Sequence, residues 1–236
     1  MQRLIRTKST LMRPVPTGVP ARLRPVAGIR AVAFDVYGTL LISANGEVLG
    51  EGEVNDRGFI AREAVTAAGI SLSPESVGRL EEEFTAETNR QRVAARAAGI
   101  EHPDPDIRDV WSAVLRDAGA AAALRQVERL AVEYELRANP TWPMPGAMAC
   151  LRALHSSNAL GIVSNAQFST PLIVGEQLGP SFRDLVPQDR CLWSYQYGHA
   201  KPGKKLFEMA AERFAEAGID RSACLFVGND MLNDIW

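Results

Sequence analysis

The chain has 236 residues, of which 46% are hydrophobic and 23% charged, a composition typical of a soluble globular protein. This length accommodates one α/β domain together with a smaller inserted or appended domain. The formal charge is −2, but residues 1–30 hold seven basic side chains and no acidic one, which leaves 19 basic against 28 acidic residues in the remainder. Such an acidic body excludes a surface built to bind nucleic acid.

The first 28 residues form a basic leader that we expect to be disordered. Four prolines lie between residues 13 and 25, and proline does not fit the interior of a regular amphipathic helix. An Arg-rich segment without acidic residues is also typical of an organelle-targeting peptide, which is the alternative interpretation. No apolar stretch has the length of a transmembrane helix, so we expect no membrane partner.

The three cysteines lie far apart and include no C-x-x-C pair. This usage is typical of a reducing compartment, and we expect a cytoplasmic location. The three histidines have no metal-ligand spacing and are expected to be ordinary polar residues. The sequence leaves the oligomeric state open.

Short runs rich in apolar and β-branched residues alternate with helical patterns from residue 29 to the end. Such alternation predicts an α/β fold with a parallel sheet covered on both faces, and a site at the carboxyl ends of the strands. This core comprises residues 29–42 and 143–236. The predicted strands lie at 29–34, 160–163, 191–194 and 224–227, and the predicted helices at 147–155, 171–178 and 203–217.

More than a hundred residues separate the first predicted strand from the second, and most of them have a helical pattern. The expected helices lie at 58–68, 74–98, 106–118 and 121–138. Asn45-Gly46 between apolar residues predicts a hairpin turn, and the proline-rich segment 140–145 predicts a stiff return to the core. We expect residues 43–142 to form a helical cap that excludes water from the site.

The first predicted strand ends in Phe34-Asp35-Val36-Tyr37-Gly38-Thr39-Leu40. An aspartate at the end of a buried strand can present its carboxylate as a nucleophile. Gly38 permits a sharp exit from the strand, and Thr39 places a hydroxyl donor beside the reacting group. A turn-capping role for Asp35 is the alternative that this segment leaves open when it is taken alone.

Three further polar segments follow the later predicted strands. Ser164 and Asn165 can donate hydrogen bonds to an anionic substrate group, and Lys201 can neutralise charge that develops on it. The last strand is followed by the segment from Gly228 to Asp234, whose two carboxylates and two amides suit a hard cation such as Mg²⁺. Taken singly, each segment is also explained as a turn or as solvated surface.

Together and in this order, the four segments resemble the four motifs of the haloacid dehalogenase-like hydrolase superfamily. The resemblance runs from about residue 29 to the end, apart from the cap, and implies a Rossmann-like core with a helical cap inserted after the first motif. By carry-over, the site consists of Asp35 as nucleophile, Thr39, Ser164 and Asn165 as groups that position the substrate anion, and Lys201 as the neutralising cation. The metal position implied by the resemblance comprises Asp35, the Tyr37 carbonyl, Asp230 and, behind it, Asp234.

Tyr37 bears on which chemistry the resemblance implies. Most superfamily members, the phosphatases, have an aspartate at that position, which protonates the leaving oxygen and later activates water, whereas the 2-haloacid dehalogenases have tyrosine. An unperturbed phenol titrates near 10 and cannot replace that acid, but a halide leaves without a proton. Tyr37 therefore favours hydrolysis of a carbon–halogen bond in a small anionic substrate, without a cofactor.

The fourth segment favours a different chemistry. The dehalogenases resemble Ser-Ser-Asn-x-x-Asp at this point and work without metal, whereas Gly228-Asn229-Asp230 followed by Asn233-Asp234 is closer to the Mg²⁺-dependent phosphatases. A Mg²⁺-dependent phosphatase is therefore the alternative. A dehalogenase should also offer a cap arginine to the substrate carboxylate or the departing halide, and Arg90 and Arg92 are the candidates.

The chain stops at Trp236, directly after the fourth motif. A doubly wound sheet normally continues with a helix, so we expect apolar surface near Ile235 and Trp236 to lack its cover. We interpret the ending as a truncation, with a covering partner as the alternative. A catalytically silent superfamily member that binds or regulates is the third interpretation of the chain.

Overall fold

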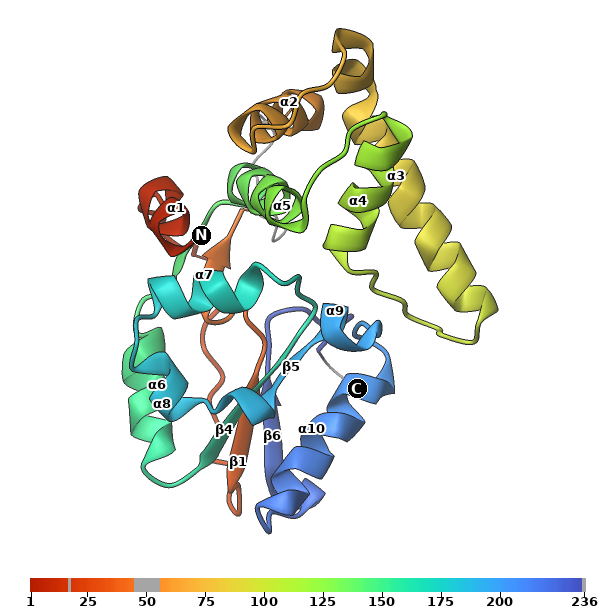
Figure 1. Ribbon diagram of the computed structural model, residues 1–236. Helices are drawn as coiled ribbons and strands as arrows, with labels where there is room; N and C mark the ends of the chain where they lie inside the picture. The colour runs from red at the N-terminus through yellow and green to blue at the C-terminus, as the bar shows by residue number, and fades with distance from the viewer. Residues whose placement is uncertain (17, 45–55, 235–236) are drawn as a thin grey trace.

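Four parallel strands form the central sheet of the computed structural model, which describes residues 1–16, 18–44 and 56–234. They are β1 (Ala31–Phe34), β4 (Ala159–Ser164), β5 (Cys191–Trp193) and β6 (Cys224–Val227), in the order β5-β4-β1-β6 across the sheet (Figure 1). β1 therefore lies inside the sheet, and all four of its residues are buried. The predicted α/β core is confirmed, and each predicted strand agrees with the observed one to within two residues.

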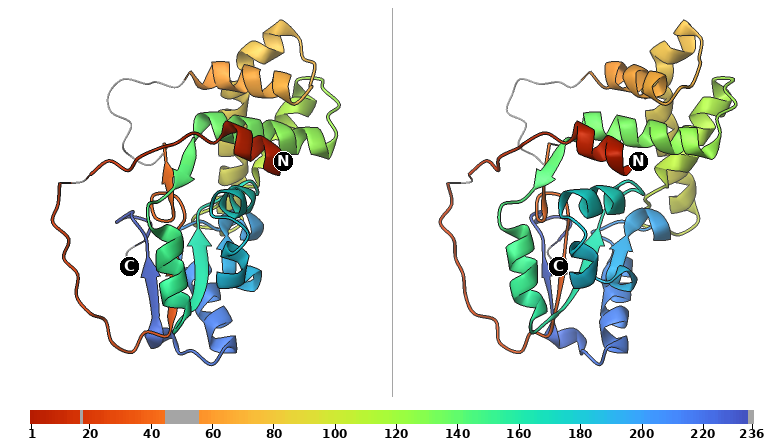
Figure 2. Two further views of the ribbon diagram at one scale, coloured as in Figure 1. Left: turned by 90° about the vertical axis from the view of Figure 1, so that its left-hand side faces the viewer. Right: turned by 60° about the vertical axis from the view of Figure 1, so that its left-hand side comes forward.

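Helices cover both faces of the sheet (Figure 2). Val32 and Phe34 of β1 point to one helical layer, and Ala31 and Ala33 point to the other. Successive side chains of a strand point to opposite faces, so a strand buried on both faces has to be apolar at every position. The first layer consists of α6 (Ala147–His155), α7 (Thr170–Gln177) and α8 (Phe182–Leu185), and the second layer consists of α10 (Lys204–Glu216). The short helix α9 (Ser194–Tyr197) follows β5, and two 3-10 turns lie at Gln188–Arg190 and Arg221–Ala223.

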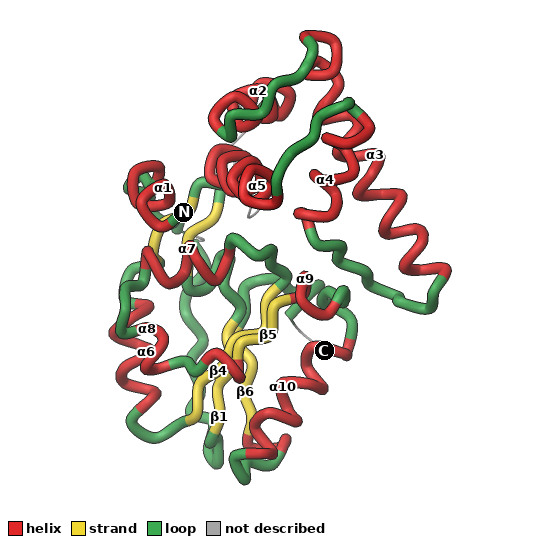
Figure 3. Tube along the Cα trace, in the orientation of Figure 1, coloured by secondary structure: helices red, strands yellow, loops and turns green. Residues whose placement is uncertain are grey.

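The cap lies beyond the carboxyl ends of the strands (Figure 3). Its helices are α2 (Arg57–Ala67), α3 (Pro74–Ala97), α4 (Ile107–Asp117) and α5 (Leu124–Ala138), within three residues of the predicted positions. The fully buried Trp111 is at its centre, with ring centroids 4.4 Å from Phe84 and 5.4 Å from Tyr134. Even α3, with 24 residues, is too polar to cross a membrane, and the same holds for the other helices that the structure describes.

Two antiparallel strands, β2 (Leu41–Ser43) and β3 (Thr141–Pro143), connect the core to the cap. Leu41 pairs with Pro143 and Ser43 pairs with Thr141, so the chain enters and leaves the cap side by side. The proline-rich return segment is therefore held in a strand by its pairing with β2. The hairpin turn predicted at Asn45-Gly46 lies outside the described residues.

The basic leader contains a helix, α1 (Gln2–Lys8), which differs from the disorder that we expected there. α1 packs on α7, with Ile5 fully buried and the Arg6 guanidinium paired with Glu176 at 2.5 Å (Figure 1). A seven-residue helix is too short to be stable alone, so this docking stabilises it and local patterns do not reveal it. Residues 9–16 and 18–28 contain neither helix nor strand.

Candidate active site

Asp35 directly follows β1, at the end of the sheet that faces the cap (Figure 1). Its backbone N–H donates to the Val227 carbonyl of β6 at 2.9 Å, which keeps the end of β1 in register with its neighbour. The chain then turns sharply, because Gly38 has a φ of +82° and a Cβ there would collide with the side chain of Asn229. Thr39 Oγ1 donates to Asn229 Oδ1 at 3.3 Å, so the first and fourth predicted segments are in contact.

Lys201 connects the predicted nucleophile to the other segments. Its ammonium group donates to Asp35 Oδ1 at 2.8 Å and to Asp234 Oδ1 at 2.5 Å, and 3% of its side chain is exposed. Asn165 holds the Lys201 backbone twice, since it accepts from the N–H at 2.7 Å and donates to the carbonyl at 3.0 Å. The fold thus brings together four predicted site residues, one from each of the four segments, with Lys201 in contact with the other three.

The Asp35 carboxyl is buried, and its pKa is raised above the ordinary value. Loss of solvent is the main cause, the Lys201 ammonium opposes the increase, and the Asp234 carboxylate adds to it. Ser164, also buried, offers a hydrogen bond that favours the charged form of Asp35. Because a carboxylate attacks only when it is ionised, Lys201 is the main group that keeps Asp35 suited to nucleophilic attack.

Asp230 and Asp234 have different surroundings in the loop after β6. Asp234 is buried, its Oδ2 accepts the Asp230 N–H at 2.9 Å, and Gly228 packs against its carboxylate with no room for a Cβ. Asp230 is half-buried, and its pKa is lowered by hydrogen bonds from the Leu232 backbone N–H and the Asn233 amide. Asp234 therefore anchors the loop, whereas Asp230 stays ionised beside the site.

A cavity of about 360 Å³, the nucleophile cavity, opens in front of these groups. It is lined by Asp35, Tyr37, Ser43, Asn139, Asn165, Lys201, Asn229, Asp230, Asn233 and Asp234. In the part of the chain that the structure describes, no three His, Cys, Asp or Glu side chains gather as a metal-binding group. Mg²⁺, however, is usually held by one or two carboxylates together with other oxygens and water. Asp35, Asp230 and the Tyr37 carbonyl are donors of this kind, so the residues present fit the ion.

Tyr37 lines the nucleophile cavity as a neutral group. Its hydroxyl shares a hydrogen bond with Thr170 Oγ1 at 2.9 Å. Burial raises the pKa of the phenol far above its ordinary value, and the carboxylates of Glu135 and Asp35 add to the increase. Tyr37 can therefore neither protonate a leaving group nor activate water near neutral pH.

A second cavity of about 430 Å³, the cap cavity, lies between the cap and the core. It shares Tyr37 and Asn165 with the nucleophile cavity, so the two are direct neighbours. Of the two predicted cap arginines, Arg92 lines the cap cavity. Arg90 is absent from both linings, is 63% exposed and pairs with Glu87 at 2.6 Å.

Two residues that sequence reasoning missed also line the cap cavity. Arg57 begins α2, and Glu135 lies in the last turn of α5. Glu135 Oε1 accepts from Asn139 Nδ2 at 3.0 Å, and burial raises the pKa of its carboxyl. Neither residue stands out locally, because arginine and glutamate are frequent throughout these helices, and only the packing of cap against core selects them.

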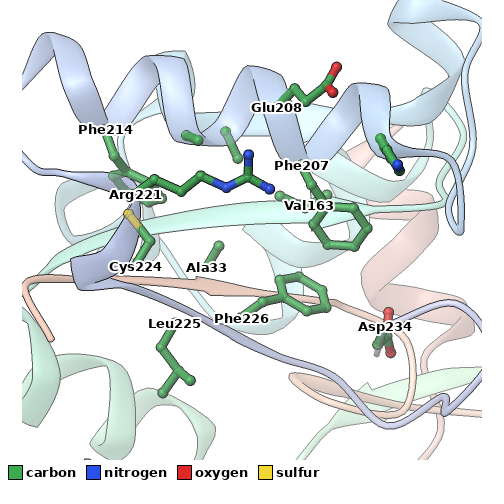
Figure 4. A pocket seen from close by; sticks show the side chains of 13 residues that line it. Ala33, Val163, Phe207, Glu208, Phe214, Arg221, Cys224, Leu225, Phe226 and Asp234 are labelled. Carbon is green, nitrogen blue, oxygen red and sulfur yellow. The ribbon is translucent and has the colours of Figure 1, made fainter. Parts of the chain in front are cut away.

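A further cavity of about 590 Å³ lies between α10 and the sheet (Figure 4) and shares Asp234 with the nucleophile cavity. Its wall is largely apolar and includes Phe207 and Phe226, whose rings are in edge-to-face contact with centroids 5.0 Å apart. Among the described residues that line it, Asp234 is the one predicted site residue. This cavity therefore lacks the groups needed for the predicted chemistry.

A protein-family model described as haloacid dehalogenase-like hydrolase matches residues 29–236. The chain belongs to this family. A 2-haloacid dehalogenase from Pseudomonas syringae pv. Tomato DC3000 has a similar fold, with 19% identity, a TM-score of 0.51 and coverage of 88% of this chain and 80% of that one. A HAD family enzyme from Bacteroides thetaiotaomicron is 15% identical, with a TM-score of 0.53 and 87% coverage of both chains.

One curated relative is the pyrimidine 5′-nucleotidase YjjG of Escherichia coli K12. It is 34% identical over 93 residues, which are 39% of this chain and 39% of the nucleotidase. The match thus spans about two fifths of that relative's length. The superfamily inferred from the motifs is confirmed, and so is hydrolase as the general activity, while the roles of single residues stay predictions.

Proposed function

We propose that this hydrolase cleaves a carbon–halogen bond in a small anionic substrate through a covalent ester on Asp35. The observation that carries the proposal is a Lys201-bonded carboxylate combined with a neutral, half-buried Tyr37 at the position of the usual proton donor. Oxygen leaving groups generally need that proton, whereas a halide departs as a stable anion. Displacement of a halide therefore needs only the Asp35 carboxylate and Lys201, and it does not need a proton donor at residue 37.

The reaction has two steps. In the first, a carboxylate oxygen of Asp35 attacks the carbon that bears the halogen, and the halide leaves with the electron pair of the broken bond. Asp35 Oδ1 is bonded to Lys201, which leaves Oδ2 for the attack. In the second step, water adds to the ester carbonyl, the alcohol departs and the Asp35 carboxylate is restored. Asp230 and Asp234 line the same cavity and are the carboxylates that can accept the proton of this water.

The substrate anion is bound from the cap side. Arg92 and Arg57 line the cap cavity, and Asn165 lies where it meets the nucleophile cavity. Guanidinium groups bind carboxylates with two parallel hydrogen bonds, so they orient a substrate as well as attract it. A haloacid held in this way would direct its carbon–halogen bond towards Asp35.

A Mg²⁺-dependent phosphatase is the second candidate, and the charge of the nucleophile cavity favours it. Among the described residues that line this cavity, Lys201 is the one cation against the carboxylates of Asp35, Asp230 and Asp234. This formal excess of two negative charges matches a divalent ion, which would offset the charge of a phosphoryl group. The partial match to a pyrimidine 5′-nucleotidase supports the same candidate. Tyr37 would restrict such an enzyme to leaving groups that need no proton, such as acyl phosphates.

One experiment separates the two candidates. We measure chloride release from L-2-chloropropionate, and phosphate release from acyl phosphates and small phosphomonoesters. Each assay is run once with Mg²⁺ and once with a chelator. Dehalogenation predicts chloride release that survives the chelator, and phosphatase action predicts phosphate release that does not.

Asp35→Asn should abolish either activity, and Asp184→Asn, at an exposed aspartate of α8, is the matched control that should leave it unchanged. Activity retained by Asp35→Asn would contradict the covalent mechanism. A wild-type protein inactive on both panels would support the catalytically silent interpretation.

A further inference from the structure

The cap cavity holds charges of both signs. Arg57 and Arg92 line it together with the carboxylates of Glu135 and Asp104. Asp104 has its own partners, because it accepts from Ser194 Oγ at 2.5 Å and from Gln167 Nε2 at 3.4 Å. Within the described chain, neither of the two arginines forms an ion pair closer than 4.0 Å or a hydrogen bond. The guanidinium groups and Glu135 are therefore available to a ligand.

Glu135 has one side-chain hydrogen bond among the described residues, whereas Asp104 has a donor at each of its two oxygens. Its Oε1 accepts from the neutral amide of Asn139, and no described residue donates to its Oε2. Its position in the last turn of α5 is unfavourable for a negative charge, because the helix dipole is negative there. Burial raises its pKa even though Arg57 and Asn139 oppose the increase. The charged form of Glu135 would thus gain most from a donor that arrives with the substrate.

We propose that Glu135 determines specificity by binding an ammonium group, so that the substrate carries a cation beside its anionic group. This inference rests on the proposed function and narrows its substrate class. Arg57 and Arg92 bind the anionic group, and Glu135 binds the cationic one. A substrate with negative charge alone would meet Glu135 as a like charge in a solvent-poor cavity, and would bind less well.

The position of Glu135 suits recognition close to the reacting bond. Its carboxylate interacts electrostatically with Tyr37, which borders both cavities. Ser43 Oγ donates to Asn139 Oδ1 at 2.7 Å, and Asn139 Nδ2 in turn donates to Glu135. Ser43 and Asn139 also line the nucleophile cavity. This chain of hydrogen bonds includes Ser43 of β2, which connects the core to the cap, and Asn139 at the C-cap of α5, so it fixes Glu135 relative to the core.

Matched substrate pairs test the proposal. 3-Amino-2-chloropropionate and 2-chloropropionate differ by one ammonium group, and so do the acyl phosphates β-alanyl phosphate and propionyl phosphate. For the wild type, kcat/KM should be at least about ten-fold higher for the ammonium-bearing member, as one charge-assisted hydrogen bond provides. Glu135→Gln keeps the size of the side chain and its bond to Asn139, so it should bring this ratio close to one, mainly through KM. Glu82→Gln, at an exposed glutamate of α3, is the control and should leave the ratio unchanged.

A binding measurement separates this inference from the proposed function. β-Alanine and propionate cannot react, and they differ by one ammonium group. Each is titrated into wild-type and Glu135→Gln protein, and its dissociation constant is measured by NMR. Tighter binding of β-alanine that disappears in Glu135→Gln supports the inference even if no substrate is turned over. Equal binding of the two ligands by the wild type, or a preference that survives in Glu135→Gln, would overturn it. If Glu135→Gln loses helical circular dichroism, Glu135→Ala replaces it, and a preference that survives there would also overturn the inference.

Discussion

Replacement of Lys201 by methionine removes the cation that Asp35 and Asp234 share. Methionine is of similar length, so the change opens little space but leaves two buried carboxylates without a counter-ion. Removal of one partner from a buried ion pair costs about 3–5 kcal/mol of unfolding free energy. For a chain of this size, each kcal/mol corresponds to about 2–4 °C, so Tm should fall by about 6–20 °C.

The loss of stability in Lys201→Met should depend on pH. Lys201 opposes the increase in the Asp35 pKa, so its removal raises that pKa further above the ordinary value of 3.8. Between 3.8 and the raised pKa, the folded state then binds more protons than the unfolded chain, and its stability increases as the pH falls through that window. The defect should therefore be largest above the raised pKa and shrink on acidification.

Urea unfolding at pH 8 and pH 5 measures both effects, with Lys205→Met on α10 as an exposed control that should stay within about 0.5 kcal/mol of the wild type. Turnover by Lys201→Met should fall by about 10²-fold or more, because a cation directed at developing charge is lost. Equal unfolding free energies of Lys201→Met and wild type at pH 8 would refute the role of Lys201 as a buried counter-ion.

Three further substitutions test other parts of the site and fold. Tyr37→Phe removes a hydroxyl bonded to Thr170 and should cost about 0.5–1.5 kcal/mol in urea unfolding. Its kcat should stay within a few-fold of the wild type, and a hundred-fold loss would show that the phenol transfers a proton. Ile5→Ala should cost about 2–5 kcal/mol and speed proteolysis of the leader, unless α1 is not docked in solution. Asp230→Asn should lower KM for an anionic substrate if no metal is used, and abolish activity if Mg²⁺ is bound.

The core and the nucleophile cavity could be predicted from sequence because both depend on local signals at strand ends. In a parallel sheet, the residues that follow each strand meet at the same end of the sheet, whatever the length of the chain between them. Asp35, Asn165, Lys201 and Asp234 are distributed over 200 residues, yet they are in contact for this reason. Gly38 and the loop around Asp234 were recognisable because close packing there restricts which residues fit.

The cap cavity could not be predicted in the same way, because tertiary packing alone determines which helix faces line it. Arg90 and Arg92 show the difficulty, since residues two positions apart on a helix point to nearly opposite sides. The structure places Arg92 in the cavity and leaves Arg90 in solvent. Arg57 and Glu135 join Arg92 from two other helices, and no spacing rule connects the three. α1 was missed for a similar reason, because its apolar face is one turn long and depends on α7.

The distribution of charge explains why the first and fourth motifs indicate different reactions. Tyr37 removes the proton donor, while Asp230 and Asp234 leave the nucleophile cavity with more negative than positive charge. This excess repels an anionic substrate, and a cation bound in or beside the cavity reduces the repulsion. A divalent ion would do so at the carboxylates themselves, whereas an ammonium group bound by Glu135 would do so from the neighbouring cavity. The two chemistries thus share the attack by Asp35 and differ in where the compensating positive charge is bound.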